Sequence, residues 1–143
     1  LITDFDSGKL SGQQIEAVWE WVRKGGVLLI GTGERGEDTL RGFGKELLEQ
    51  PLPQPDERVI NMGVEYAVDR PEGASIPLVC TDVMLKGGTE VLGSDELSVL
   101  SSVSAGSGLV AVAMYDFVDI EEFCQPISLI LTICLPPFWV KIR

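Results

Sequence analysis

Four aspartates that follow two predicted strands are the residues of this chain best suited to chemistry. They are Asp4, Asp6, Asp116 and Asp119. The strands are the apolar stretches at residues 1–3 and 109–114, and if they are parallel their carboxyl ends meet at one edge of a sheet, where α/β folds bind ligands. Four carboxylates at that edge would suit Ca²⁺ or Mg²⁺. The alternative is structural, because aspartate is common in loops as a cap of helices and turns.

A glycine-rich loop at residues 31–36 offers a second kind of site. Its sequence GTGERG matches the GxGxxG pattern of dinucleotide-binding loops and lies between a predicted strand and a predicted helix. In such loops the glycines let the backbone approach a pyrophosphate at the start of a helix. The glycines concerned are Gly31, Gly33 and Gly36.

Two features of the neighbouring sequence oppose nucleotide binding. A dinucleotide site needs an acidic residue at the end of a second strand about 20 residues further on, but residues 53–55 are Pro-Gln-Pro. Glu34, Glu37 and Asp38 also bring negative charge to the place where a pyrophosphate would sit. Arg35 offsets part of that charge. The alternative interpretation is a tight turn at the end of a strand.

The composition opposes several classes of function. The 143-residue chain contains no histidine, so by itself it has no imidazole to act as a base, an acid or a metal ligand. Its 22 acidic and 11 basic residues give a formal net charge of -11, which repels nucleic acids and anionic membrane surfaces. The cysteines are far apart and form no CxxC pair, so we expect buried apolar thiols rather than a zinc site or disulfides. They are Cys80, Cys124 and Cys134.

A helix followed by a strand is the clearest structural unit in the chain. Ser11 and Gln14 have the spacing of a capping box, and Gly25 is placed to end the helix. An apolar stripe at helical spacing predicts the face that packs on a sheet. It consists of Ile15, Val18, Trp19 and Val22. The apolar run at residues 27–30 predicts a strand covered on both faces. With residues 1–3 it predicts a βαβ unit whose strands are parallel.

Downstream of this unit the sequence changes character. Asp38 is placed to cap a second helix whose apolar residues recur as far as Leu48. The proline-rich residues 51–58 predict a loop. Short β-type runs separated by turn residues then dominate, above all in residues 76–103. Residues 86–89, Lys-Gly-Gly-Thr, predict a hairpin turn between two of these strands.

The two ends of the chain do not match a complete domain. The first residue already lies within a predicted strand, which suggests truncation at the N-terminus. Near the other end we expect a helix to begin at residues 120–125. Residues 126–143 then form an apolar stretch that is too short to span a bilayer and is broken by two adjacent prolines. Our hypothesis is that these last residues come from a shifted reading frame or a mispredicted end, which the parent nucleotide sequence would test.

Two segments resemble class I glutamine amidotransferase-like domains. In the first, DSGKLSGQQIEAVWEWVRKGGVLLIGTG at residues 6–33, a helix ending in WVxxGG leads into a central strand. The second, GLVAVAMYDFVDIEEFC at residues 108–124, resembles the closing strand and helix of the version found in large envelope-associated proteins of Gram-positive bacteria. The resemblance implies a flavodoxin-like three-layer α/β sandwich with a mainly parallel sheet over residues 1–125. It also implies a membrane-anchored, extracytoplasmic parent protein.

The same resemblance indicates what this chain lacks. Catalytic members hold a nucleophilic cysteine on the sharp turn after a strand and activate it with a histidine and an acidic partner. Here the turn after the predicted strand is Gly31-Thr32-Gly33, which has no cysteine. Cys80 and Cys124 do not substitute, because their apolar surroundings and acidic neighbours disfavour a thiolate.

We therefore predict an α/β domain with a β-rich, hairpin-containing second half that serves as a non-catalytic structural or interaction module of a larger bacterial protein. Its partners would be other domains of the parent chain or other proteins, with no nucleic acid, no cofactor and no direct insertion into a membrane. The residues themselves leave the compartment open. The alternative is a nucleotide- or divalent-metal-binding domain that uses residues 31–36 or the four aspartates.

Overall fold

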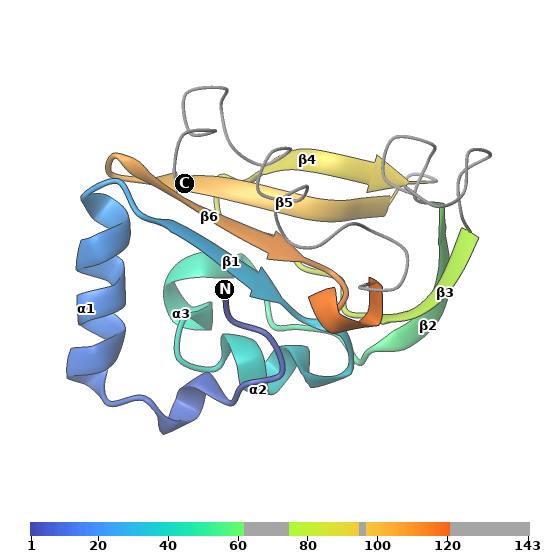
Figure 1. Ribbon diagram of the computed structural model, residues 1–143, viewed down its shortest axis with the longest axis horizontal. Helices are drawn as coiled ribbons and strands as arrows, with labels where there is room; N and C mark the ends of the chain where they lie inside the picture. The colour runs from blue at the N-terminus through green and yellow to red at the C-terminus, as the bar shows by residue number, and fades with distance from the viewer. Residues whose placement is uncertain (62–74, 95–96, 121–143) are drawn as a thin grey trace.

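The centre of the fold is a four-stranded mixed sheet with the strand order β1–β6–β5–β4 (Figure 1). The computed structural model describes residues 1–61, 75–94 and 97–120. The strands of the sheet are β1 (Val27–Gly31), β4 (Thr89–Ser94), β5 (Leu97–Ala105) and β6 (Gly108–Ala113). β1 and β6 run parallel, whereas β6 with β5 and β5 with β4 are antiparallel.

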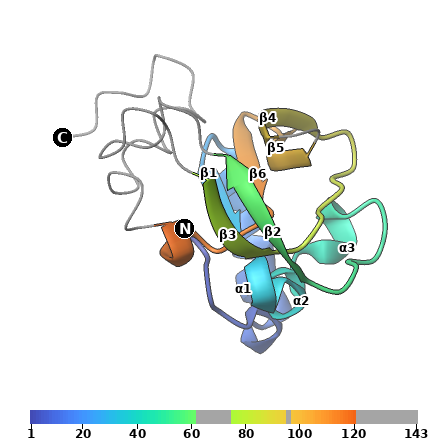
Figure 2. The ribbon, with the colours of Figure 1, turned by 90° about the vertical axis from the view of Figure 1, so that its right-hand side faces the viewer.

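A helical layer and a pair of strands lie on opposite faces of β1 and β6. The helices are α1 (Gly12–Arg23), α2 (Gly36–Leu40) and α3 (Gly44–Leu47), and the short 3-10 turns are η1 (Ser7–Lys9), η2 (Gly33–Arg35) and η3 (Phe117–Ile120). The antiparallel pair is β2 (Asp56–Asn61) with β3 (Ser75–Cys80). Figure 2 shows this pair in front of β1 and β6.

The side chains of β1 alternate between two hydrophobic clusters. Leu28 and Ile30 belong to the cluster formed with the helices, where Trp19 meets Phe43 edge to face with ring centroids 6.1 Å apart. Leu29 belongs to the cluster formed with β2, β3 and η3. Because both of its faces are covered, the strand carries no polar side. The prediction made from residues 27–30 is therefore confirmed.

Helix α1 forms as its sequence predicts. The Ser11 hydroxyl accepts a hydrogen bond from the Gln14 backbone N–H at 3.3 Å, and the Gln14 side-chain oxygen accepts one from the Ser11 N–H at 2.8 Å. These two bonds complete the capping box. Gly25 follows the helix at φ +112°, a conformation that favours glycine. The members of the predicted apolar stripe all pack in the helical cluster.

The N-terminal residues join the sheet through a parallel bridge to β1. The Ile2 N–H donates to the Leu29 carbonyl at 2.8 Å, and the Gly31 N–H donates to the Ile2 carbonyl at 2.9 Å. This confirms that residues 1–3 and 27–30 are parallel neighbours linked through α1. The chain then bends at Asp4, which has φ +46°.

The predicted flavodoxin-like three-layer sandwich with a mainly parallel sheet is wrong. Within the four-stranded sheet one pair of neighbours is parallel and two are antiparallel. Parallel neighbours need a connection of about a dozen residues or more, usually a helix, whereas β4, β5 and β6 follow one another after short connections. Helices α2 and α3 have five and four residues, too few for helical crossovers between parallel strands. The fold is therefore mostly β-sheet with few short helices.

The second helix predicted from Asp38 is also wrong. Two short helices, α2 and α3, replace it, with a break at residues 41–43 and Asp38 inside α2 instead of at a cap. Gly42 and Gly44 lower the helix propensity at the break. Three of the four apolar residues that suggested the helix are nevertheless buried and the fourth, Leu48, is half-buried, because the tertiary core decides their position. The buried ones are Leu40, Phe43 and Leu47.

Two loop predictions need correction. The predicted 51–58 loop is shorter, since β2 begins at Asp56. Residues 86–89 do contain a turn, with Gly87 at φ +65°, but they do not join two paired strands. Leu85, just before the turn, bridges Leu48 instead. The predicted 120–125 helix is described only as far as Ile120 in η3, and residues 126–143, Cys124 and Cys134 lie outside the described part of the chain.

Candidate functional site

A polar cavity of about 200 Å³ lies where β1 and β6 end. It brings together the N-terminal segment, the η2 turn after β1 and the residues after β6. Its lining residues are Asp4, Glu34, Arg35, Asp116, Val118 and Asp119. Parallel β1 and β6 place these segments at the carboxyl edge of the sheet, where ligands bind in α/β proteins.

Three of the four predicted aspartates line this cavity, and the fourth does not. Asp4, Asp116 and Asp119 share it with Glu34, which the sequence analysis did not assign to the site. Asp6 instead accepts a hydrogen bond from the Gly8 N–H and pairs with Arg41 at 3.3 Å. The three converge because residues 1–3 run parallel to β1 and β1 runs parallel to β6, so the segments after them meet at one edge.

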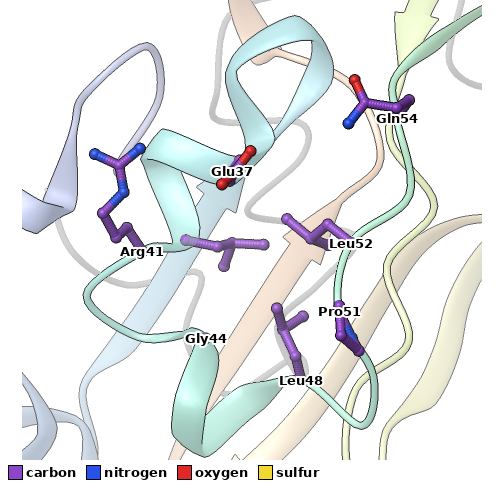
Figure 3. Close-up of a pocket in the computed structure, with 8 residues that line it drawn as sticks. Glu37, Arg41, Gly44, Leu48, Pro51, Leu52 and Gln54 are labelled. Carbon is purple, nitrogen blue, oxygen red and sulfur yellow. The ribbon is translucent and has the colours of Figure 1, made fainter.

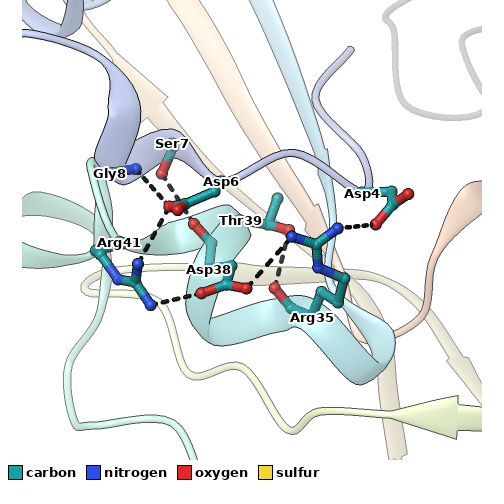
Figure 4. A network of polar contacts seen from close by, with 8 residues as sticks. All are labelled: Asp4, Asp6, Ser7, Gly8, Arg35, Asp38, Thr39 and Arg41. Atoms are coloured by element: carbon teal, nitrogen blue, oxygen red, sulfur yellow. Dashed lines mark hydrogen bonds and ion pairs between the residues drawn. The ribbon is translucent and has the colours of Figure 1, made fainter.

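A network of ion pairs neutralises part of this acidic edge (Figure 4). The Arg35 guanidinium donates to Asp4 at 2.6 Å and reaches Asp38 at 3.4 Å. Asp38 also pairs with Arg41, which continues the network to Asp6. Exposed pairs of this kind contribute about 0–1 kcal/mol each, so the network orients the N-terminal segment on α2 more than it stabilises the fold.

The two aspartates after β6 have different environments. Asp116 accepts hydrogen bonds from the Thr3 hydroxyl and from the Val118 N–H, the latter at 2.9 Å, so it acts as the predicted cap of the turn. Asp119 has a pKa raised above its ordinary value, first by burial and then by the negative charges of Asp116 and Glu34. The cavity is therefore a place where added positive charge would be favoured.

Among the described residues, the structure shows no ready coordination shell for the predicted metal ion. Within residues 1–61, 75–94 and 97–120, no three carboxylate or thiol side chains are arranged to hold an ion. Arg35, held by Asp4 at 2.6 Å, already supplies a positive charge at the cavity.

The three glycines of the 31–36 loop serve packing. A Cβ on Gly33 would lie 3.0 Å from the Asp116 backbone nitrogen, and its φ of +60° favours glycine. A Cβ on Gly31 would lie 2.9 Å from the Thr3 hydroxyl, and a Cβ on Gly36 would lie 3.0 Å from the Thr32 side chain of the same loop. The α2 helix that follows has five residues, far shorter than the helices that bind pyrophosphate in Rossmann folds. The geometry matches the tight-turn interpretation more closely than a phosphate cradle.

Near this edge, none of the described residues is an activated nucleophile. The buried Thr32 hydroxyl donates to the Ala113 carbonyl at 2.7 Å, and the buried Thr81 hydroxyl donates to the Gly33 carbonyl at 2.7 Å. Burial raises the pKa of the Cys80 thiol to about 11, so the thiol stays protonated at neutral pH. This agrees with the expectation of a buried apolar cysteine.

A second cavity, of about 430 Å³, lies between α2, α3 and the proline-rich segment after α3 (Figure 3). We call it the leucine groove, and its apolar lining consists of Leu40, Leu48, Pro51 and Leu52. Glu37, Arg41 and Gln54 add polar groups. Sequence reasoning missed this groove because it treated residues 51–58 as a connection. The signal available was Leu52, an apolar residue inside that proline-rich loop.

Comparisons with protein-family models, with curated proteins and with solved structures found no match. The resemblance to class I glutamine amidotransferase-like domains therefore stays a prediction from the quoted segments. Among the helices of the described residues, none has the length and apolar character required to cross a membrane.

Proposed function

We propose that this chain is a non-catalytic interaction module of a larger protein. The observation that carries the proposal is the packing of the turn after β1. The amidotransferase-like resemblance would put a nucleophile at this turn. Thr32 occupies it, and its buried hydroxyl is bonded to the Ala113 carbonyl at 2.7 Å. With no histidine in the 143 residues, the chain has no imidazole to activate that hydroxyl.

The leucine groove supports a binding role. Protein interfaces combine an apolar centre with a polar rim, and the groove places four apolar residues beside Glu37, Arg41 and Gln54. The partners we propose are other domains of the parent chain or separate proteins. The formal net charge of -11 opposes nucleic acids as partners.

A ligand screen by thermal unfolding tests this function. The purified chain is heated with NAD, FMN, glutamine, Mg²⁺ or Ca²⁺, because a ligand that binds the folded state raises the melting temperature in a saturable way. We expect no saturable rise with any of them, and no release of ammonia from glutamine. Turnover of glutamine, or a saturable rise with a nucleotide, would contradict the proposal.

The polar cavity supports a second candidate, the binding of a divalent cation. Four carboxylates line it against one guanidinium, and carboxylates are the ligands that Ca²⁺ and Mg²⁺ prefer. In the same screen this candidate predicts a rise with Ca²⁺ or Mg²⁺ that Asp119→Asn removes. Glu57→Gln, an exposed change on β2, is the matched control. A rise that both variants lose equally would point to nonspecific screening of the negative charge.

A further inference from the structure

The leucine groove presents apolar side chains that the fold does not fully cover. Leu40 is its buried part, with 1% of its surface exposed. Leu48 and Leu52 pack against the helical cluster but are only half-buried, and Pro51 beside them is exposed. Figure 3 shows Leu48 and Leu52 facing the space between the helices and the segment after α3. The groove therefore offers apolar surface to another molecule.

The walls of the groove are held in place before anything binds. The Lys86 N–H donates to the Leu47 carbonyl at 2.8 Å, which ties the end of α3 to a distant segment of the chain. On the other side, Pro51, Pro53 and Pro55 each restrict the residue before them to an extended backbone. A groove that is formed in advance loses little conformational entropy when it binds a partner.

The unpaired charge on the rim of the groove is negative. The guanidinium of Arg41 already pairs with Asp38 and, at 3.3 Å, with Asp6, and Figure 3 shows it directed away from Leu52. Glu37 is exposed, and among the described residues no cation pairs with it. Its carboxylate can therefore attract a cation of a partner, and the formal net charge of -11 adds a long-range attraction of the same sign.

We infer that the leucine groove binds a short segment of a partner protein in which large apolar side chains stand near an arginine or a lysine. The apolar side chains lie against Leu48 and Leu52, and the basic side chain pairs with Glu37. The volume of about 430 Å³ lies within the range of about 300–1,000 Å³ that is typical of ligand sites, so the groove takes a few side chains of a partner. The inference rests on the proposed function, since it gives the chemistry of the partner that this interaction module binds.

A second copy of this chain is a poorer occupant of the groove. Two molecules that each carry a formal net charge of -11 repel each other, whereas a basic segment is attracted. Sedimentation of the chain alone measures whether copies associate.

Peptide binding measured by fluorescence polarisation tests the inference. The first probe set consists of capped, labelled heptapeptides that carry two leucines and one arginine at every spacing, with alanine elsewhere. The second set has citrulline, a neutral analogue, in place of arginine, and the third has serine in place of leucine. We expect the first set to bind at least about tenfold more tightly than the third, the effect of burying a leucine side chain. We expect it to bind about two- to fivefold more tightly than the second, the effect of an exposed charge pair.

Charge variants of the full chain assign this binding to the groove. Glu37→Gln should abolish the preference for arginine over citrulline, and Gln54→Glu, which adds a carboxylate to the lining, should increase it. Glu57→Gln on β2 and Gln13→Glu on α1 are the matched controls, since both positions are exposed and lie outside the groove. The controls should leave the preference unchanged.

The inference is overturned if the first set shows no saturable binding at about 1 mM, a very weak affinity. It is also overturned if Glu37→Gln keeps the arginine preference, or if the chain alone forms dimers that block the peptides. These results differ from a failure of the proposed function, which turnover of glutamine or a saturable effect of a nucleotide would show whatever the peptides do. Absent peptide binding with a flat ligand screen would reject this occupant of the groove and leave the interaction module standing.

Discussion

At the scale of single residues, Gly33 shows how a loop that matches a nucleotide-binding pattern is used for packing. Its φ of +60° lets the chain turn sharply after β1, and the Asp116 backbone occupies the space beside it. A Cβ at this position would lie 3.0 Å from the Asp116 nitrogen, so the turn itself requires glycine. At Gly33, the GxGxxG spacing of residues 31–36 therefore reflects the need for glycine in a tight turn.

Substitution of Gly33 tests this use. Gly33→Ala forces a side chain into a left-handed conformation, which costs about 1–2 kcal/mol, and adds a contact at 3.0 Å from the Asp116 nitrogen. Gly87→Ala is the matched control, because Gly87 has φ +65° but nothing within 4 Å of its Cβ position. Urea unfolding should show a larger loss of stability for Gly33→Ala than for Gly87→Ala. Equal losses of stability would mean that the contact with Asp116 adds nothing to the cost of the left-handed conformation.

The raised pKa of Asp119 predicts a pH-dependent stability. Burial, Asp116 and Glu34 favour the neutral form of Asp119 in the fold, so the fold is relatively more stable below the ordinary carboxyl pKa. This contribution is lost as the pH rises through the raised pKa. Asp119→Asn, which stays neutral, should therefore raise stability at pH 7 and change little below about pH 3, where the carboxyl is protonated in both states. Chemical unfolding at the two pH values measures this.

The control for Asp119 is Glu57→Gln, an exposed carboxylate on β2 outside the cavity. It removes one negative charge from a chain of net charge -11 without changing the cavity. A gain in stability of the same size from both variants would attribute the effect to net charge. A loss of stability with Asp119→Asn at pH 7 would contradict the stated environment of Asp119.

At the scale of elements, α1 is held by signals within its own sequence. The capping box satisfies backbone donors at its start, and a stripe of apolar residues packs it on the sheet. The helices after β1 lack such signals and are short, and their buried residues are placed by the core.

Removing the cap of α1 tests whether signals within its own sequence hold this helix. Ser11→Ala deletes the hydroxyl that accepts from the Gln14 N–H, and loss of a serine cap costs about 0.5–2 kcal/mol. Ser104→Ala, at an exposed position of β5, is the matched control. Urea unfolding should show a loss of stability for Ser11→Ala and little change in stability for Ser104→Ala. No difference between the two variants would show that packing alone sets the start of α1.

At the scale of the whole molecule, the β2–β3 pair is the layer that closes one face of the sheet. Ile60 and Ile76 are register partners in this pair and belong to the same buried cluster as Leu29 of β1. Two isolated strands have little stability in water, so this pair depends on its contact with the sheet. We expect the two parts to unfold together.

Truncation of Ile60 tests this dependence. Ile60→Ala removes a side chain that is 1% exposed and should cost about 2–5 kcal/mol. Val59→Ala, on the same strand but 61% exposed, is the matched control and should cost far less. Amide exchange in β6 should accelerate with Ile60→Ala if unfolding is cooperative. If amide exchange accelerates in β2 and β3 but stays unchanged in β6, the expectation that the two parts unfold together is wrong.

The candidate site was partly predictable from the sequence. Asp4, Asp116 and Asp119 could be placed together because the apolar runs before them predict strands, and the carboxyl ends of parallel strands meet. The role of Asp6 could not be predicted from the sequence, because its pairing with Arg41 depends on how α2 packs beside η1. Glu34 was missed for a similar reason, because its place in the cavity depends on contacts with segments distant in the sequence. The leucine groove was missed because residues 51–58 were treated only as a connection.

The sequence by itself determined α1, β1 and their parallel link to residues 1–3. Capping, helical periodicity and an uninterrupted apolar run all act within a few residues, so short windows of sequence contain them. Only the tertiary structure decided that β6 pairs with β1, that β4 and β5 extend the sheet in antiparallel fashion, and that β2 and β3 cover its face. Strand pairing depends on contacts between residues such as Val27 and Leu109, and local preference does not specify which distant strand is chosen.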